Sequence, residues 1–174
     1  YGAWFDKLVQ APGVVTKDGP TAAAFAAPLV RNGAPIAIDG IGIGSSALDF
    51  LVGLGLRVIP IIGSEGCNNS RDITGTLRFK NKRARMYWRL REALDPTNPA
   101  PISLPPDQEL LGDLAAVRYK AVQMGQAIAG IQMRDKDEIR EALGRSPDKG
   151  DAVAMTFDDE MPAAGLGDDA AAYR

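Results

Sequence analysis

The sequence contains no histidine and only one cysteine, Cys67, and both scarcities limit its chemistry. Without histidine, these residues form no Ser-His-Asp triad, no Cys-His pair and no histidine zinc site. A single cysteine also excludes an internal disulfide and a thiolate zinc cluster. Because Cys67 lies in a polar segment, we interpret it as incidental rather than catalytic. Carboxylates, lysines and hydroxyls are the groups that remain for chemistry.

The sequence also lacks an apolar run of transmembrane length, a signal-peptide pattern and a strong net charge. Its 174 residues are 45% hydrophobic, which suffices for one well-buried domain. We place this domain at residues 1–158. Residues 159–174 are acidic and rich in alanine and glycine, and we assign them to a flexible tail. The formal net charge of −2 gives no overall attraction to nucleic acid, so such binding requires a local basic surface.

A strand, a helix and a second strand are predicted in succession over residues 35–62, a pattern typical of a parallel βαβ unit. The first strand is short and apolar and ends at Asp39, and a glycine-rich turn over residues 40–44 follows it. Open α/β sheets bind ligands beyond the carboxyl ends of their strands, so Asp39 is a candidate site residue. We expect the helix over residues 45–54 to bury a stripe that consists of Leu48, Phe50, Leu51 and Leu54.

Two further carboxylates lie near the end of the expected domain. Ser146 is suited to cap a helix and Pro147 to occupy its first position, so we predict that a helix begins here. Asp148 and Asp151 then project from the same side, and Gly150 between them leaves room for a neighbouring strand or a phosphate backbone. Two interpretations remain open: the carboxylates complement the helix dipole, or they join the strand-end carboxylate in binding Mg²⁺ or Mn²⁺.

Basic residues crowd the segment over residues 78–91. A solvated helix face explains most such runs, whereas phosphate contacts are the alternative, and the sequence favours neither. The candidates for phosphate contacts include Lys80, Lys82, Arg83 and Arg85.

Local signals predict most of the remaining elements. They are a strand over residues 1–10, a helix over residues 20–32 ended by Gly33, a helix over residues 82–94 capped by Asn81, a helix capped by Asp107, a β-hairpin over residues 118–133 around Gly125, and a short charged helix over residues 135–143. In the helix over residues 82–94, we expect a buried side that consists of Ala84, Tyr87, Trp88 and Leu94.

The order of several short segments resembles the C-terminal nuclease domain of tailed-phage large terminase subunits, which belongs to the RNase H-like nucleases. These segments span nearly the whole chain up to Phe157. They are Trp4-Phe5-Asp6-Lys7-Leu8, Asp39-Gly40-Ile41-Gly42-Ile43-Gly44 with Asp49-Phe50-Leu51, Phe79-Lys80-Asn81-Lys82-Arg83-Ala84, Leu104-Pro105-Pro106-Asp107-Gln108-Glu109-Leu110, Lys136-Asp137-Glu138-Ile139-Arg140 and Gly144-Arg145-Ser146-Pro147-Asp148-Lys149-Gly150-Asp151-Ala152.

The resemblance implies an α/β fold, namely an RNase H-like central mixed β-sheet that is flanked by helices, lacks its first strand and carries an added β-hairpin. It also implies an endonuclease that cleaves concatemeric double-stranded DNA with two Mg²⁺ or Mn²⁺ ions. Asp39 and Asp151 are then metal ligands, and Asp148 is an extra acidic residue like that of Holliday-junction resolvases. Lys136 either meets the scissile phosphate or is a solvated lysine on a charged helix.

The resemblance has one departure and several implied partners. The family's first metal-binding aspartate lies on a strand upstream of Trp4, and Asp6 is not its equivalent, so we expect the site in this sequence to be short of one ligand. No Gly-x-x-x-x-Gly-Lys-Ser/Thr loop is present for an ATPase motor. The implied partners are DNA, the terminase ATPase domain, the small terminase subunit and the portal. The implied location is the host cytoplasm, without a membrane partner.

Two other functions remain as alternatives. A catalytically incomplete domain that positions DNA fits a site short of one ligand. A nucleotide-binding α/β module would use the glycine-rich turn, but Asp39-Gly40-x-Gly42-x-Gly44 is not the dinucleotide-binding pattern, and an aspartate there would repel a pyrophosphate.

Overall fold

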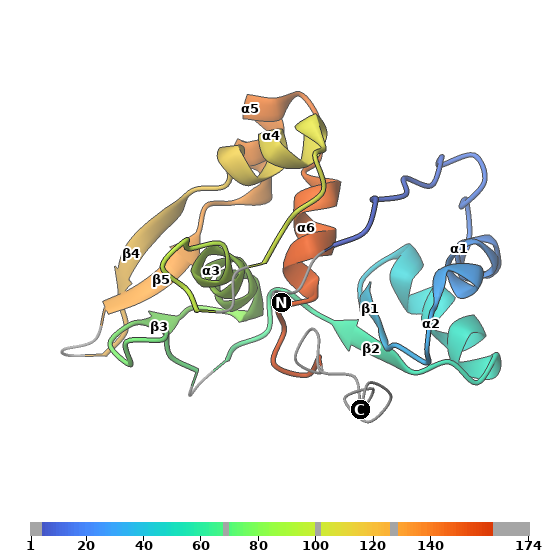
Figure 1. Cartoon of the computed structure of the whole chain (residues 1–174), viewed down its shortest axis with the longest axis horizontal. Coiled ribbons are helices and arrows are strands. Elements are labelled where there is room, and N and C mark those ends of the chain that lie inside the picture. The colour runs from blue at the N-terminus through green and yellow to red at the C-terminus, as the bar shows by residue number, and fades with distance from the viewer. Residues whose placement is uncertain (1–4, 68–69, 100–101, 126–128, 162–174) are drawn as a thin grey trace.

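The computed structural model describes residues 5–67, 70–99, 102–125 and 129–161. Figure 1 shows its two small sheets on opposite sides of α3 and α6. The mixed α/β fold class is confirmed, with the strands divided between two sheets. In chain order the elements are α1 (Gly19–Ala26), η1 (Ala27–Leu29), β1 (Ile36–Asp39), α2 (Ile43–Gly53), β2 (Val58–Ile61), β3 (Arg78–Phe79), α3 (Lys82–Ala93), α4 (Gln108–Ala116), β4 (Tyr119–Gln123), β5 (Ala129–Met133), α5 (Lys136–Leu143) and α6 (Asp148–Met155).

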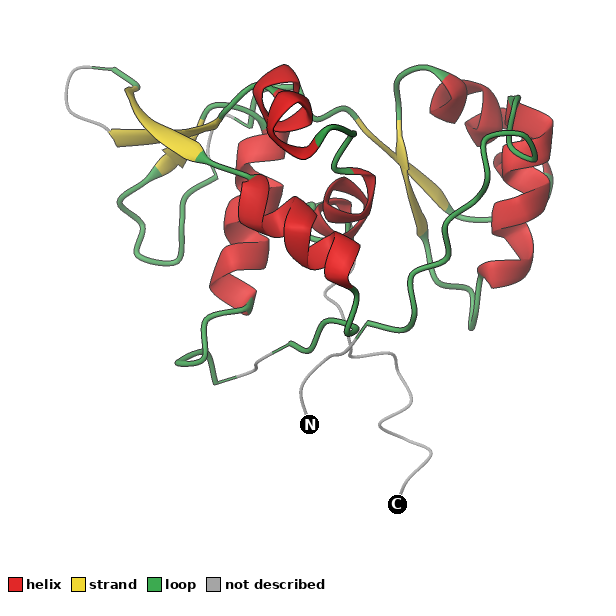
Figure 2. Ribbon diagram, turned by 90° about the horizontal axis from the view of Figure 1, so that it is seen from above, coloured by secondary structure: helices red, strands yellow, loops and turns green. Residues whose placement is uncertain are grey.

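The predicted βαβ unit is confirmed. β1 and β2 run parallel, with Asp39 opposite Ile61. Figure 2 shows this pair of strands between the central helices and the pair formed by α1 and α2. Leu51 of α2 is buried as expected, but Phe50 and Leu54 are 48% and 62% exposed. The predicted stripe was too wide because the side of α2 that carries Leu51 packs on a sheet of only two strands and on α1.

The second sheet contains β3, β5 and β4, in that order. β5 pairs antiparallel with β4 and parallel with β3, and Ile131 lies opposite Ala121 on one side and Phe79 on the other. The predicted hairpin is therefore present, and residues 126–128 of its connection lie outside the described residues. β3 was not predicted, because two residues are too few to show an alternating pattern.

The main core lies between α3, α6 and the two sheets. Asn81 caps α3 as predicted, its side chain accepting a hydrogen bond of 3.0 Å from the amide of Ala84. Ala84, Tyr87 and Trp88 are buried as expected, whereas Leu94, after the last turn, is 38% exposed. Phe79, Leu90, Ile131 and Val153 are among the other buried residues of this core.

Two predicted elements in the first part of the chain were wrong. The helix expected over residues 20–32 ends at Ala26 and gives way to the short turn η1, because Pro28 has no amide hydrogen to continue the helical ladder. Residues 5–10 form no strand, and residues 1–4 lie outside the described residues. Phe5 is held by packing on Phe157 and by one hydrogen bond from its amide to the carbonyl of Ser103.

The start of the expected tail is attached to the domain. Asp158 is only 3% exposed, and its carboxylate lies 2.7 Å from the guanidinium of Arg85. Asp159 contacts the same guanidinium at 2.9 Å, and Glu160 contacts Lys82 at 2.7 Å. Residues 159 and 160, which we assigned to the flexible tail, therefore contact the domain. Residues 162–174 lie outside the described residues.

In the part of the chain that the structure describes, none of the helices has the length and apolar character needed to cross a membrane.

Candidate active site

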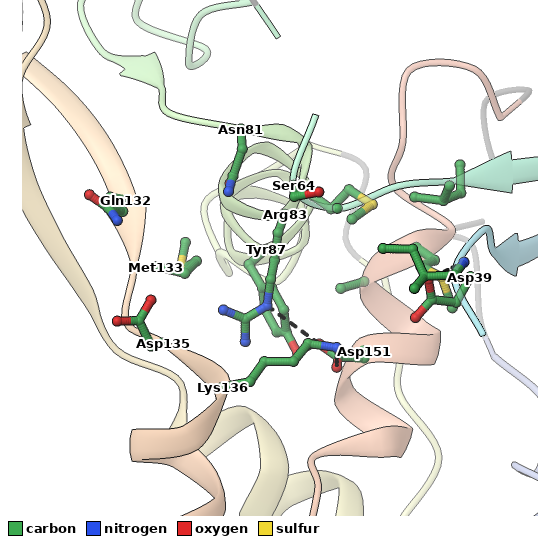
Figure 3. A pocket seen from close by; sticks show the side chains of 16 residues that line it. Asp39, Ser64, Asn81, Arg83, Tyr87, Gln132, Met133, Asp135, Lys136 and Asp151 are labelled. Carbon is green, nitrogen blue, oxygen red and sulfur yellow. Dashed lines mark hydrogen bonds and ion pairs between the residues drawn. The ribbon is translucent and has the colours of Figure 1, made fainter. Parts of the chain in front are cut away.

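A cleft of about 430 Å³ brings together polar side chains from four parts of the chain. Figure 3 shows these side chains projecting from the end of β1, from α3, from the junction of β5 and α5, and from α6. Among its lining residues the charged ones are Asp39, Arg83, Asp135, Lys136 and Asp151. Three carboxylates thus face two cations, an arrangement that leaves the cleft with net negative charge.

Asp39 is the last residue of β1, as the sequence predicted. Its Oδ1 accepts a hydrogen bond of 3.2 Å from the amide of Ile41, so the turn that follows holds the carboxylate. A side chain at Gly44 would lie within 1.8 Å of the Asp39 carbonyl oxygen, so only glycine lets α2 begin this close to the strand end. Asp39 itself is exposed and forms no ion pair with the other described residues.

Asp151 is held in the cleft by the packing of α6 against α4. The predicted cap was wrong, since α6 begins at Asp148 and its N-cap is Pro147. Instead of Ser146, the buried carboxylate of Asp113 on α4 accepts a hydrogen bond of 3.0 Å from the amide of Gly150.

Gly150 allows this approach, but the neighbour is a helix rather than a strand. A Cβ at Gly150 would lie 3.0 Å from the Cβ of Asp113, tighter than most packed contacts. The carboxylate of Asp113 is also paired with Arg145 at 2.6 Å. The start of α6 is therefore held by a carboxylate of α4 that is paired with Arg145, in the segment just before α6.

One hydroxyl and two cations surround the Asp151 carboxylate. Oδ1 accepts a hydrogen bond of 2.7 Å from the hydroxyl of Tyr87, and Oδ2 lies 2.7 Å from Nζ of Lys136. Nε of Arg83 lies 3.8 Å from Oδ1, and its guanidinium stacks over the Tyr87 ring at 5.3 Å. Burial, and next the negative charge of Asp151, raise the pKa of Tyr87 well above its usual range. The phenol therefore stays protonated and remains a donor to Asp151.

The structure adds one acidic residue to the predicted set and separates another from it. Asp135 lines the cleft, just after β5 and before α5. The sequence signal was available, because Asp135 follows an apolar strand as Asp39 does. Asp148 is exposed at the first position of α6 and is not among the residues that line the cleft. Lys136, at 39% side-chain exposure, reaches Asp151 from the start of α5.

The basic residues of α3 are engaged within the protein. Arg85 is 6% exposed and pairs with the two aspartates at residues 158 and 159. Lys82 pairs with Glu65 and Glu160. Arg83 donates to the carbonyl of Arg134 and faces the cleft. Of the four candidates for phosphate contacts, Lys80 alone is exposed and has no ion pair with another described residue.

The only cysteine does not belong to the cleft. Cys67 is buried, and its thiol lies 3.6 Å from the carbonyl oxygen of Phe79. Burial raises the pKa of the Cys67 thiol, which disfavours the thiolate that nucleophilic chemistry requires.

The donor set of the cleft suits a hard divalent cation in kind. Carboxylate oxygens are the ligands that Mg²⁺ and Mn²⁺ prefer. The number of possible ligands is small, however. The described residues contain no group of three or more acidic or thiol side chains close enough to hold a metal ion. Two carboxylates are fewer ligands than such an ion takes, so any ion in this cleft would need further oxygen ligands.

No protein-family model and no curated protein sequence matches the chain. Solved structures do match. The nuclease domain of the large terminase subunit of bacterial virus Sf6 superposes with a TM-score of 0.63 at 19% identity, over 85% of this chain and 73% of that one. The chain has the fold of a terminase nuclease domain. A point mutant of the Sf6 domain with manganese and beta-thujaplicinol gives a TM-score of 0.63 at 18% identity, over 93% of this chain and 80% of that one.

A further Sf6 structure, a mutant of the same terminase fold with calcium, has a TM-score of 0.61 at 18% identity and covers 82% of this chain and 71% of that one. These matches confirm the RNase H-like fold that the order of sequence motifs predicted. The terminase fold also explains why residues as far apart in sequence as Asp39 and Asp151 line one cleft.

Proposed function

We propose that this chain is the nuclease domain of a phage large terminase subunit and cleaves concatemeric double-stranded DNA with Mg²⁺ or Mn²⁺. The observation that carries the proposal is the shared cleft of Asp39 and Asp151, two carboxylates that the motif order had singled out, in a chain with the terminase nuclease fold. Divalent cations in the related Sf6 structures support the choice of cofactor.

In this proposal, Asp39 and Asp151 hold the ions, and Asp135 contributes negative charge at the same cleft. When bound, two ions supply Lewis-acid activation of the attacking water and charge stabilisation at the leaving 3′ oxygen. Tyr87 keeps Asp151 oriented through its hydrogen bond of 2.7 Å. The Asp151 oxygens face Lys136 and Arg83, so these cations neutralise the carboxylate, and a bound metal ion would compete with them for its oxygens.

Lys136 is the side chain best placed to meet the scissile phosphate. It is partly exposed, it lines the cleft and its ammonium already contacts one metal-ligand candidate. A lysine in this position stabilises the negative charge that develops on the phosphate oxygens as the bond breaks. Asp148 is a weaker candidate for a ligand, since it lies outside the lining of the cleft.

The turn after β1 argues against a nucleotide-binding module. The amide of Gly40 donates to the carbonyl of Ile61 and the amide of Ile41 donates to the Asp39 side chain. These amides are therefore occupied within the turn, whereas a phosphate-binding loop directs free amides at its ligand.

A DNA-positioning domain without catalysis is the second candidate. The observation in its favour is that no group of three metal-binding side chains occurs among the described residues. By family resemblance we also propose the terminase ATPase domain, the small terminase subunit and the portal as partners, and the host cytoplasm as the location.

The proposal is tested by the response of the chain to Mn²⁺. Binding to the folded state raises the melting temperature, and a concentration of one hundred times Kd corresponds to about 2.7 kcal/mol, or roughly 5–10 °C for a chain of this size. We expect Asp39→Asn and Asp151→Asn to lose most of this rise. The matched control is Asp137→Asn, because Asp137 is 91% exposed on α5 and outside the cleft. Asp148→Asn is expected to keep the rise.

Plasmid cleavage in Mn²⁺ then separates the two candidates. The nuclease is supported if this chain, or a version extended upstream, cuts the plasmid and Asp39→Asn abolishes the cutting. A metal site in this cleft is contradicted if the chain shows no Mn²⁺ response. It is also contradicted if Asp137→Asn abolishes the response as fully as Asp39→Asn does.

A further inference from the structure

The face of the three-stranded sheet that points away from α3 is a separate basic surface. Side chains alternate between the two faces of a strand. Ile131, Met133 and Phe79 are buried, and Tyr119 contacts the ring of Trp88 on α3 at 5.1 Å, so these residues mark the inner face. The residues that alternate with them in the same strands therefore point outward.

Strand register arranges the outward residues in two rows. Lys120 lies opposite Gln132, and the amide of Lys80 donates to the carbonyl of Ile131, so Lys80, Gln132 and Lys120 form a row across three strands. With strands about 4.8 Å apart, the two lysines start roughly 10 Å from each other. The neighbouring row begins with Arg78, which lies opposite Gly130.

A fourth cation extends this neighbouring row. Arg71 forms an antiparallel bridge with Arg78, so the two side chains leave the sheet on the same side. Like charges directly opposite each other destabilise a sheet. The strands that carry this face contain no Asp or Glu. Among the described residues no carboxylate pairs with Arg71, Arg78, Lys80 or Lys120. The sheet thus keeps an internal repulsion that a bound polyanion would relieve.

We propose that this basic sheet face, defined by Arg71, Arg78, Lys80 and Lys120, binds the phosphate backbone of duplex DNA. The choice of DNA rests on the proposed nuclease function. The position of the face supports it, because Gln132 lies between the two lysines of one row and also lines the cleft of Asp39 and Asp151. A backbone that follows this row therefore arrives at the cleft.

This assignment differs from the one that the basic run in the sequence suggests. Lys82 and Arg85 belong to that run, but acidic side chains already neutralise both. Lys120 lies far from the run in sequence and was not a candidate, yet strand pairing places it on the same face as Lys80, with Gln132 of β5 between them.

The experiment compares two double variants with the same change in charge. Lys80→Gln/Lys120→Gln removes two cations from the sheet face. Lys7→Gln/Lys17→Gln is the matched control, because both lysines are exposed, and Lys17 precedes α1 at the other end of the molecule (Figure 1). Binding to a short fluorescent DNA duplex is measured without divalent ions between 50 and 200 mM salt.

We expect the sheet variant to reduce the slope of log K against log salt by about 2, since each phosphate contact contributes roughly 0.9. At 0.1 M salt this corresponds to a loss of about tenfold to hundredfold in affinity. The control is expected to bind like the wild type. Equal slopes for the sheet variant and the wild type, equal losses in the two variants, or no DNA binding by the wild type overturn the inference.

The same measurements separate this inference from the proposed function. Asp137→Asn should keep the salt slope of the wild type, because Asp137 belongs to neither the cleft nor the sheet face. If the sheet variant loses DNA binding while the Mn²⁺ response and cleavage are absent, the basic sheet face stands and the nuclease assignment fails. If cleavage is intact and the sheet variant binds DNA as the wild type does, the nuclease assignment stands and the inference about the basic sheet face fails.

Discussion

Replacing Arg85 by methionine tests whether this arginine serves the fold rather than DNA. Its side chain is 7% exposed, and its guanidinium lies 2.7 Å from the fully buried carboxylate of Asp158 and 2.9 Å from that of Asp159. Methionine keeps much of the apolar stem but leaves Asp158 without its cation. Removing one partner of a buried pair typically costs about 3–5 kcal/mol, because an uncompensated charge stays behind.

That cost is large for a domain of this size. Folded domains are stable by about 5–15 kcal/mol, and urea lowers this by about 1–3 kcal/mol per molar. Arg85→Met should therefore lower the urea midpoint by roughly 1–5 M. Asp158→Asn removes the charge but keeps an acceptor for the amide of Glu160, which lies 3.0 Å away.

A double-mutant cycle isolates the pair. The double variant Arg85→Met/Asp158→Asn should be less destabilised than the sum of the single variants, with a coupling of about 1–3 kcal/mol, because no buried charge is left alone. Urea unfolding followed by circular dichroism at pH 7 gives all four stabilities. A loss below about 1 kcal/mol for Arg85→Met, or additive effects in the cycle, refutes a structural role for this pair.

Two further predictions concern buried polar groups. Tyr87→Phe removes the hydroxyl that donates to Asp151 at 2.7 Å and should cost about 1.5–3 kcal/mol at pH 7. Since the pKa of Tyr87 is raised in the folded state, its contribution to stability is full below the unfolded pKa of about 10 and is lost progressively above it. The difference in unfolding free energy between the wild type and Tyr87→Phe, measured by urea titration, should therefore be smaller at pH 10.5 than at pH 7. For Asp72, burial opposes ionisation, but hydrogen bonds from Thr74 and from the amides of Leu77 and Thr76 outweigh it and lower its pKa. Asp72→Asn should therefore cost about 1–2 kcal/mol at pH 7, and the loss should diminish as the pH falls from about 4, where the unfolded chain takes up the proton, through the lowered pKa of the folded wild type. A loss that is the same at pH 3 and pH 7 contradicts this reasoning.

Local chemistry made much of the fold predictable from the sequence. Asn81 and Asp107 cap the helices that follow them, because a cap needs only its own side chain and the next few amides. The same holds for Gly144, whose φ of 69° ends α5. The apolar strand before Asp39 was long enough for its end to be placed correctly.

Predictions failed where a distant segment supplied the decisive contact. Ser146 had the right chemistry for a cap, but Asp113 on another helix satisfies the amide of Gly150 and α6 begins later. Asp135 follows an apolar strand as Asp39 does, but only the packing of β5 beside α3 shows that it lines the cleft. Asp148 was included because helix spacing put it on the same side as Asp151. It does not line the cleft, whereas Asp151 does, and its role as a metal ligand stays a prediction.

The value of a cation for binding an anion depends on whether the fold has already neutralised it. Lys82 and Arg85 belong to the basic run of α3. Acidic residues around residues 158–160 neutralise them, and composition alone assigned most of that segment to a tail. Lys80 escapes this neutralisation because it leaves β3 on the outer face of the sheet, away from those acids. Counting charges along the sequence therefore overstates the number of cations on the helix that are free of carboxylates. Strand register is the information that the count lacks, since it places Lys120 on the same face as Lys80, with Gln132 between them.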